Sequence, residues 1–110
     1  MSLLDNLDKN LKYPNESQFY FGMFEFWQNS AQIAFYVSAR FGVKGQSKYY
    51  MNFINKGLEK ELIESEKFNP LGGDINVTFY RLTSKGKKQK ELIQVEQESK
   101  RYRVKNICLN

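Results

Sequence analysis

The stretch INVTFYRL, residues 75–82, is the clearest strand in the chain, and the segments on either side of it decide the fold. Its β-branched and aromatic residues favour extended structure. The preceding segment, NPLGGD at residues 69–74, is rich in the residues that form turns. Residues 62–68, LIESEKF, suit a second extended segment. Together these three segments predict a β-hairpin.

Three helices are expected before the hairpin. The first covers residues 16–28, with Asn15 as its cap, and it is apolar on nearly every side. A helix of this kind lies in the centre of a core or is buried by a partner. A strand is the alternative for this segment, because aromatic residues also favour strands. The main apolar face of the helix has four members: Phe19, Met23, Phe26 and Trp27.

The second and third helices are separated by a short turn. Residues 31–41 form the second, with a cap at Asn29-Ser30 and Gly42 as the glycine that ends it. Residues 47–61 form the third, and Tyr50 fits the core-facing side of that helix. The turn between the two helices has the sequence VKGQ.

A final helix follows the hairpin, with Thr83 as its cap. Along this helix, apolar residues recur at alternating spacings of three and four, which is typical of a short coiled-coil seam. A polar residue, Ser99, interrupts that seam, whose apolar members are Leu92, Val95 and Tyr102.

The order helix, helix, turn, helix, hairpin, helix is that of a winged helix-turn-helix. LEKELIESE at residues 58–66, Gly72-Gly73, and FYRLTSKGKKQKEL at residues 79–92 resemble the wing of PadR- and MarR-like regulators. AQIAFYVSARFG at residues 31–42 resembles the PadR segment that precedes the recognition helix. The resemblance covers about residues 30–95. The sequence departs from the family in its very aromatic first helix, its short turn before the third helix and its lysine-rich final helix.

The resemblance implies an α+β, mostly helical fold: a winged helix-turn-helix with a two-stranded β-wing and an added C-terminal helix. We expect an N-terminal lead-in over residues 1–14 and a single domain over residues 15–110. The C-terminal helix, at about residues 84–104, is expected to form a dimer.

The distribution of charge points to a polyanionic partner. Residues 1–66 contain 7 Lys and Arg against 8 Asp and Glu, a net charge of −1. Residues 67–110 contain 10 against 4, a net charge of +6. A basic half of this kind is typical of nucleic-acid binding, although basic surface helices are also common in soluble proteins.

The composition argues against most kinds of catalysis. The chain has no histidine and one cysteine, Cys108, which removes histidine-based catalysis and zinc sites built from Cys and His. We therefore expect no enzyme activity, no cofactor and no metal site. No apolar run is long enough to span a membrane, and the polar N-terminus is unlike a signal peptide. The predicted location is the cytoplasm, in association with the nucleoid.

The predicted partner is double-stranded DNA, with the start of the third helix in the major groove. Polar side chains there would read bases, and nearby cations would contact phosphates. The predicted DNA-binding residues are Arg40, Lys44, Gln46, Ser47, Lys48, Tyr49, Asn52, Lys67, Arg81, Lys85 and Lys87.

The second predicted partner is another copy of the chain, because a dimer doubles the contacts on a palindromic site. Surplus aromatic surface on the first helix and the seam of the last helix suggest the contact. The predicted interface residues are Phe19, Phe26, Trp27, Leu92, Val95 and Tyr102.

Transcriptional regulation is the function that we expect, and two alternatives stay open. A plasmid-partition protein that binds a centromere, together with a partition protein as partner, would use the same module. A winged-helix adaptor for protein interactions would instead use the aromatic first helix and the amphipathic last helix as its working surfaces.

Overall fold

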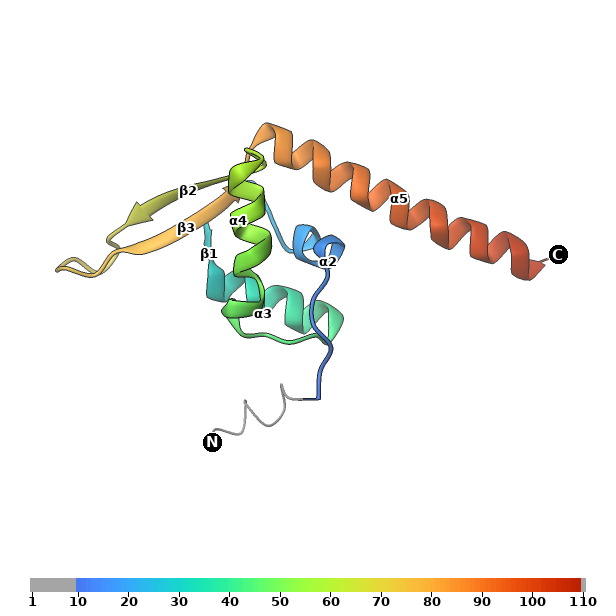
Figure 1. Ribbon diagram of the computed structural model, residues 1–110, viewed down its shortest axis with the longest axis horizontal. Helices are drawn as coiled ribbons and strands as arrows, with labels where there is room; N and C mark the ends of the chain where they lie inside the picture. The colour runs from blue at the N-terminus through green and yellow to red at the C-terminus, as the bar shows by residue number, and fades with distance from the viewer. Residues whose placement is uncertain (1–9, 110) are drawn as a thin grey trace.

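The computed structural model describes residues 10–109, and the side chains of residues 10–96. Its most prominent feature is the hairpin formed by β2 (Ile63–Phe68) and β3 (Val77–Leu82), which projects from the body of the molecule (Figure 1). The two strands are antiparallel and pair from Ile63 opposite Leu82 to Phe68 opposite Val77. The predicted wing is therefore confirmed.

The first predicted helix is too long. The structure has a short helix, α2 (Glu16–Phe21), which ends at Gly22. A Cβ atom on Gly22 would lie 2.3 Å from Cγ2 of Val37, so this glycine allows the chain to pass close to the next helix. Residues 22–27 are not helical, and a two-residue strand, β1 (Gln28–Asn29), follows.

β1 completes a three-stranded antiparallel sheet in the order β1-β3-β2. Gln28 pairs with Tyr80, and Asn29 pairs with Phe79. The strand alternative for residues 16–28 is thus correct for Gln28 alone, the last residue of that segment. Pairing with β3 outweighs the helical pattern because it supplies backbone partners that the helix would otherwise provide.

The caps of the first two helices match the sequence analysis. Asn15 Oδ1 accepts a hydrogen bond of 2.9 Å from the Gln18 backbone N–H. Asn29 does the same for α3 (Ser30–Phe41), accepting at 2.8 Å from the Gln32 backbone N–H. α3 ends at Gly42, whose φ of 65° is in the left-handed region that glycine adopts at low cost.

The third predicted helix is divided into two parts. A 3₁₀ turn, η1 (Ser47–Tyr49), is followed by α4 (Met51–Glu59). Tyr50 lies at the junction, is fully buried, and donates a hydrogen bond of 2.6 Å to the Lys44 carbonyl oxygen. The prediction that Tyr50 belongs to the core is confirmed, and its anchoring explains why the backbone tightens there.

The core lies between α2, α3, α4 and the sheet. α2, α3 and α4 each contribute at least one side chain that is completely buried, and the sheet covers the remaining side. The largest fully buried side chains are Phe19, Met23, Ile33, Val37, Tyr50 and Ile54. Leu62, Ile63, Tyr80 and Leu82 close the core from the sheet side.

The last helix, α5 (Ser84–Leu109), begins against the body and then extends away from it (Figure 1). Thr83 caps it as predicted, since its Oγ1 accepts from the Gly86 backbone N–H at 3.0 Å. Lys90 connects the first turns of α5 to the segment that follows α2. Its Nζ donates to the Met23 carbonyl oxygen at 2.7 Å and lies 4.1 Å from the Phe24 ring centroid. Burial lowers the pKa of Lys90, against an opposing effect of Glu25.

No helix in the described part of the chain is both long and apolar enough to cross a membrane.

Candidate nucleic-acid interface

The start of the third helical segment presents polar side chains on one face. Lys48 and Asn52 are exposed, and their spacing of four residues places them on the same side of η1 and α4. Asn55, one turn further on, is exposed on that side as well. It was missed by the sequence analysis, although its spacing from Asn52 was a sufficient signal. Gln46 and Ser47 are partly exposed at the entrance to η1.

An aromatic and cationic cluster braces this segment. The Tyr13 and Tyr49 rings meet edge to face, with their centroids 5.3 Å apart. Lys44 Nζ lies 5.0 Å from the Tyr13 centroid, and Lys48 Nζ lies 5.1 Å from the Tyr49 centroid. Lys44 is only 7% exposed, so it lies inside the cluster rather than at the surface, where a phosphate would reach it. Tyr13, which the sequence analysis did not select, is 68% exposed.

Arg40 is exposed in the last turn of α3. Its guanidinium carbon lies 5.3 Å from the Phe21 ring centroid and 5.6 Å from that of Phe41. Because stacking on rings leaves the N–H groups at the edge of a guanidinium available, this position suits a phosphate contact. Together with the residues described above, Arg40 completes what we call the recognition group: Arg40, Gln46, Ser47, Lys48, Tyr49 and Asn52.

The wing carries few charges near its tip. Lys67 is exposed on β2, opposite Thr78. The tip itself turns at Gly72 and Gly73, whose φ angles of 77° and 75° require glycine for an unstrained backbone. Asn69 closes the turn by donating from Nδ2 to the Gly73 carbonyl oxygen at 2.7 Å.

Three predicted DNA-binding residues form a separate group at the base of the wing. Arg81 donates from Nε to Glu64 Oε1, and its guanidinium carbon lies 4.2 Å from the Trp27 ring centroid. Lys87 Nζ lies 3.2 Å from Glu25 Oε1, with both side chains more than half exposed. Lys85 is exposed in the first turn of α5. The end of β3 and the first turns of α5, which carry Arg81, Lys85 and Lys87, lie near the C-terminal end of α4 (Figure 1), whereas η1 precedes its N-terminal end. The structure therefore does not bring these residues together with the recognition group.

The predicted dimer residues differ in their exposure. Phe19 is completely buried within the chain, so it has no surface for a partner, and that part of the prediction is wrong. Phe26 is 59% exposed, and Leu92 and Val95 are each 62% exposed. Trp27 is partly buried, with its ring centroid 5.5 Å from that of Phe68. Tyr102 lies beyond the residues whose side chains are described.

An aromatic groove on α3 is a further feature of the surface. Phe24 stacks on Phe26 with centroids 5.0 Å apart, and it meets Tyr36 edge to face at 5.4 Å. Phe35 is 75% exposed beside them. Phe35 and Tyr36 were missed by the sequence analysis, although they fall outside the buried stripe of Ile33, Ala34 and Val37 in the α3 sequence.

Three solved structures have a similar fold. A PadR-like transcriptional regulator from Bacillus cereus is 14% identical, with a TM-score of 0.71 over 86% of this chain and 91% of that one. A PadR-like transcription factor from Bacteroides fragilis is 13% identical, with a TM-score of 0.68 over 84% and 87%. A PadR family transcription regulator from Clostridium difficile is 19% identical, with a TM-score of 0.66 over 86% and 97%.

The chain matches no protein-family model and no curated protein sequence. The similarity in structure confirms the α+β winged-helix fold and the resemblance to PadR-like proteins that the wing sequence predicted.

Proposed function

We propose that this protein binds double-stranded DNA in a sequence-specific manner as a homodimer and regulates transcription. The observation that carries the proposal is the exposed polar face of η1 and α4, which begins with Lys48 and Asn52 and lies in a winged-helix frame. The three structural neighbours are described as transcriptional regulators, which supports a regulator rather than an enzyme.

The physical basis is the match between this face and the major groove. The groove of B-DNA is about 12 Å wide and accepts one α-helix. An asparagine such as Asn52 can form two hydrogen bonds with adenine, and a lysine such as Lys48 can donate to guanine. Arg40 and Lys67 are exposed, and contacts from them to phosphates beside the groove would fix the orientation of the protein.

Dimer formation is supported by the exposed apolar residues of α5. A solvated helix gains nothing from Leu92 and Val95 at 62% exposure, whereas burial against a second α5 would remove both from water. A two-fold dimer would then present two recognition helices to a palindromic site.

Replacing Gln46 or Asn52 by alanine is expected to weaken binding at a specific site by roughly 1–3 kcal/mol each, with a smaller effect on unrelated DNA. The reason is that each change removes hydrogen bonds to a base edge without altering the charge of the protein. Fluorescence anisotropy with a specific and a scrambled duplex measures both affinities.

Gln94→Ala, which removes the same amide from α5, is the matched control and should bind like the wild type. If Gln46→Ala and Asn52→Ala both keep wild-type affinity and preference, the proposed recognition face is wrong.

Replacing Lys87 by alanine is expected to make the dependence of DNA affinity on salt shallower while the sequence preference stays the same. Each phosphate that a protein neutralises contributes about −0.9 to the slope of log K against log salt. Lys87 lies 3.2 Å from Glu25, but both are exposed, so that ion pair exchanges readily for a phosphate. Lys85→Ala should behave in the same way.

The measurement is a titration of duplex DNA at several salt concentrations. Lys88→Ala removes the same charge one residue away and is the comparison. An unchanged slope in both Lys85→Ala and Lys87→Ala would remove the base of the wing from the interface.

An adaptor for protein interactions is the second candidate, and the aromatic groove is the observation that favours it. Phe26 and Phe35 are 59% and 75% exposed, more than DNA binding requires. A partition protein would share the DNA-binding module, and a neighbouring gene for a partition ATPase would favour that function over regulation.

A further inference from the structure

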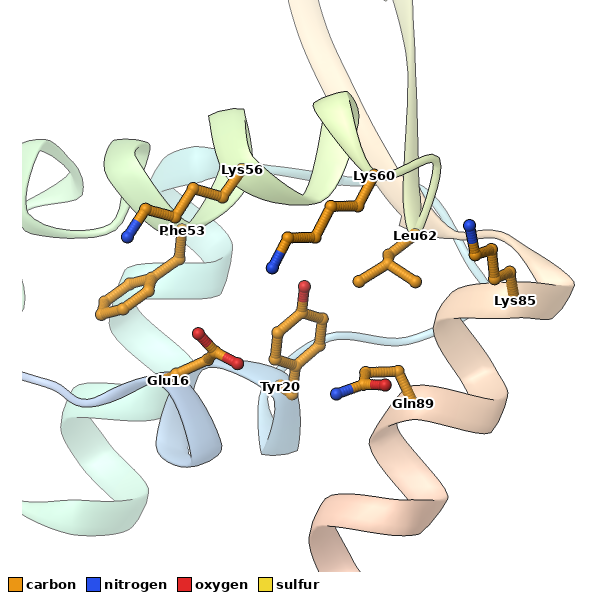
Figure 2. A pocket seen from close by; sticks show the side chains of 8 residues that line it. All are labelled: Glu16, Tyr20, Phe53, Lys56, Lys60, Leu62, Lys85 and Gln89. Atoms are coloured by element: carbon orange, nitrogen blue, oxygen red, sulfur yellow. The ribbon is translucent and has the colours of Figure 1, made fainter.

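A small pocket lies between α2, the C-terminal half of α4 and the first turns of α5 (Figure 2). Its volume is about 230 Å³. Because three helices and Leu62, just before β2, contribute to it, the pocket exists only in the folded chain. The residues that line it are Glu16, Tyr20, Phe53, Lys56, Lys60, Leu62, Lys85 and Gln89.

The charge of this pocket is strongly positive. Three lysines line it: Lys56 on α4, Lys60 at the end of that helix and Lys85 on α5; Glu16 is the one carboxylate among the lining residues. In Figure 2 the Lys60 ammonium lies near the Tyr20 hydroxyl, whereas those of Lys56 and Lys85 point to either side of it. Within the described part of the chain, none of the three ammonium groups has a carboxylate oxygen within 4.0 Å. Three lysines in one concave site repel each other, so a bound anion would be stabilised there.

Tyr20 adds a hydrogen-bond donor at the bottom of the pocket. The residue is only 4% exposed, and Figure 2 shows its hydroxyl pointing toward the side where Lys60 lies. Burial, and secondly the charge of Glu16, raise the pKa of Tyr20, so the phenol keeps its proton and remains a donor. In Figure 2 the Gln89 amide lies beside the base of the Tyr20 side chain, at the end away from the hydroxyl.

We propose that this pocket binds a small phosphate monoester. The lining side chains carry a net charge of +2, from three lysines and one glutamate, and a phosphate monoester carries about −1.5 to −2 at neutral pH. The volume is below the roughly 300 Å³ at which drug-sized pockets begin, so the organic part of the ligand is small.

The position of Lys56 and Lys60 favours a free ligand over a phosphate of bound DNA, although the third lysine of the pocket, Lys85, is also proposed to contact DNA at the base of the wing. Lys60 lies just beyond the C-terminal end of α4, whereas the recognition group lies around η1 at the other end. An anion held by Lys60 and Lys85 would join the recognition helix to α5, the helix of the proposed dimer. Any effect of this bound anion on DNA binding rests on the proposed function, but the binding of the anion to the pocket does not.

Calorimetric titration with inorganic phosphate, in buffer of constant ionic strength adjusted with chloride, tests the proposal. The wild type is expected to bind phosphate at one saturable site. The double variant Lys56→Gln, Lys60→Gln should bind about a hundredfold more weakly, since each lost charge-assisted hydrogen bond corresponds to roughly a factor of ten. Tyr20→Phe, which keeps the ring, should show a smaller loss.

Lys88→Gln is the matched control, because it removes one exposed charge from α5 outside the pocket and should leave phosphate binding unchanged. Equal melting temperatures would show that the variants are folded. Absence of saturable binding in the wild type, or full binding in the double variant, would overturn the proposal.

DNA affinity of the double variant in phosphate-free buffer separates the two sources of phosphate. A free ligand predicts an affinity within about twofold of the wild type, because that variant would lose no DNA contact. A loss above tenfold with a shallower salt slope would assign the lysines to the DNA backbone and overturn the proposal. Phosphate binding is measured without DNA, so failure of the DNA-binding proposal leaves this test intact.

Discussion

Replacing Leu92 by glutamate is expected to convert the proposed dimer into monomers and to abolish tight binding to a palindromic site. Two-fold symmetry would bring two new carboxylates into one apolar interface, and an unpaired buried charge costs on the order of several kcal/mol. Leu92 is 62% exposed in the single chain, so the substitution has little effect on the fold of the subunit itself. Val95→Glu should act in the same way.

Sedimentation of the wild type and the variants at micromolar concentration measures this effect, and duplex binding is followed in parallel. Gln94→Glu adds the same charge to another face of α5 and should remain dimeric. A wild type with the mass of one chain, unchanged by Leu92→Glu, would contradict the dimer.

Replacing Gly86 by alanine is expected to destabilise the subunit by roughly 3 kcal/mol. A Cβ atom at this position would lie 1.9 Å from the Leu62 carbonyl oxygen and 2.9 Å from the Leu62 carbonyl carbon. Leu62 cannot move aside easily, because its carbonyl oxygen accepts a hydrogen bond of 3.0 Å from the Thr83 backbone N–H. The first turn of α5 would therefore be forced away from the sheet.

Thermal and denaturant unfolding measure this change, and its sign is informative. In an unobstructed helix, the same substitution stabilises by about 1 kcal/mol. Ser84→Ala, on the exposed side of the same turn, should stay within about 0.5 kcal/mol of the wild type. A Gly86→Ala protein that is as stable as the wild type, or more stable, would show that α5 is not seated as described.

Local sequence signals predicted the elements whose ends they mark. Asn29 and Gly42 mark the two ends of α3, and Thr83 marks the start of α5. These signals are local, because caps and left-handed glycines act within one turn of the backbone. The hairpin was predictable for the same reason: its turn residues and its β-branched strand are adjacent in the sequence.

The end of α2 was not predictable in this way. The apolar spacing of residues 16–28 continues past Gly22, but the helix stops there because Gly22 meets Val37 and the chain goes on to pair with Tyr80. Both causes are tertiary contacts with residues far along the chain. Because the helix ends at Gly22, Phe19 lies in the core whereas Phe26 lies at the surface.

The sequence predicted which residues belong to the candidate site better than it predicted how those residues are arranged. Lys48 and Asn52 lie on an exposed face as expected, whereas Lys44 is enclosed by tyrosines and Arg81 is paired with Glu64. A count of charges cannot distinguish an exposed cation from a paired one. The pocket between α2, α4 and α5 was not predicted at all, since its lysines come from segments separated by the hairpin.

Fluorescence anisotropy with a labelled duplex from the region upstream of the protein's own gene tests the central claim most directly. A scrambled duplex of equal length and composition serves as the comparison, and both are titrated at several salt concentrations. We expect tighter binding to the upstream duplex, by a factor of about 10³ or more, and an affinity that falls steeply with salt. Equal affinity for the two duplexes, or a flat response to salt, would contradict sequence-specific DNA binding.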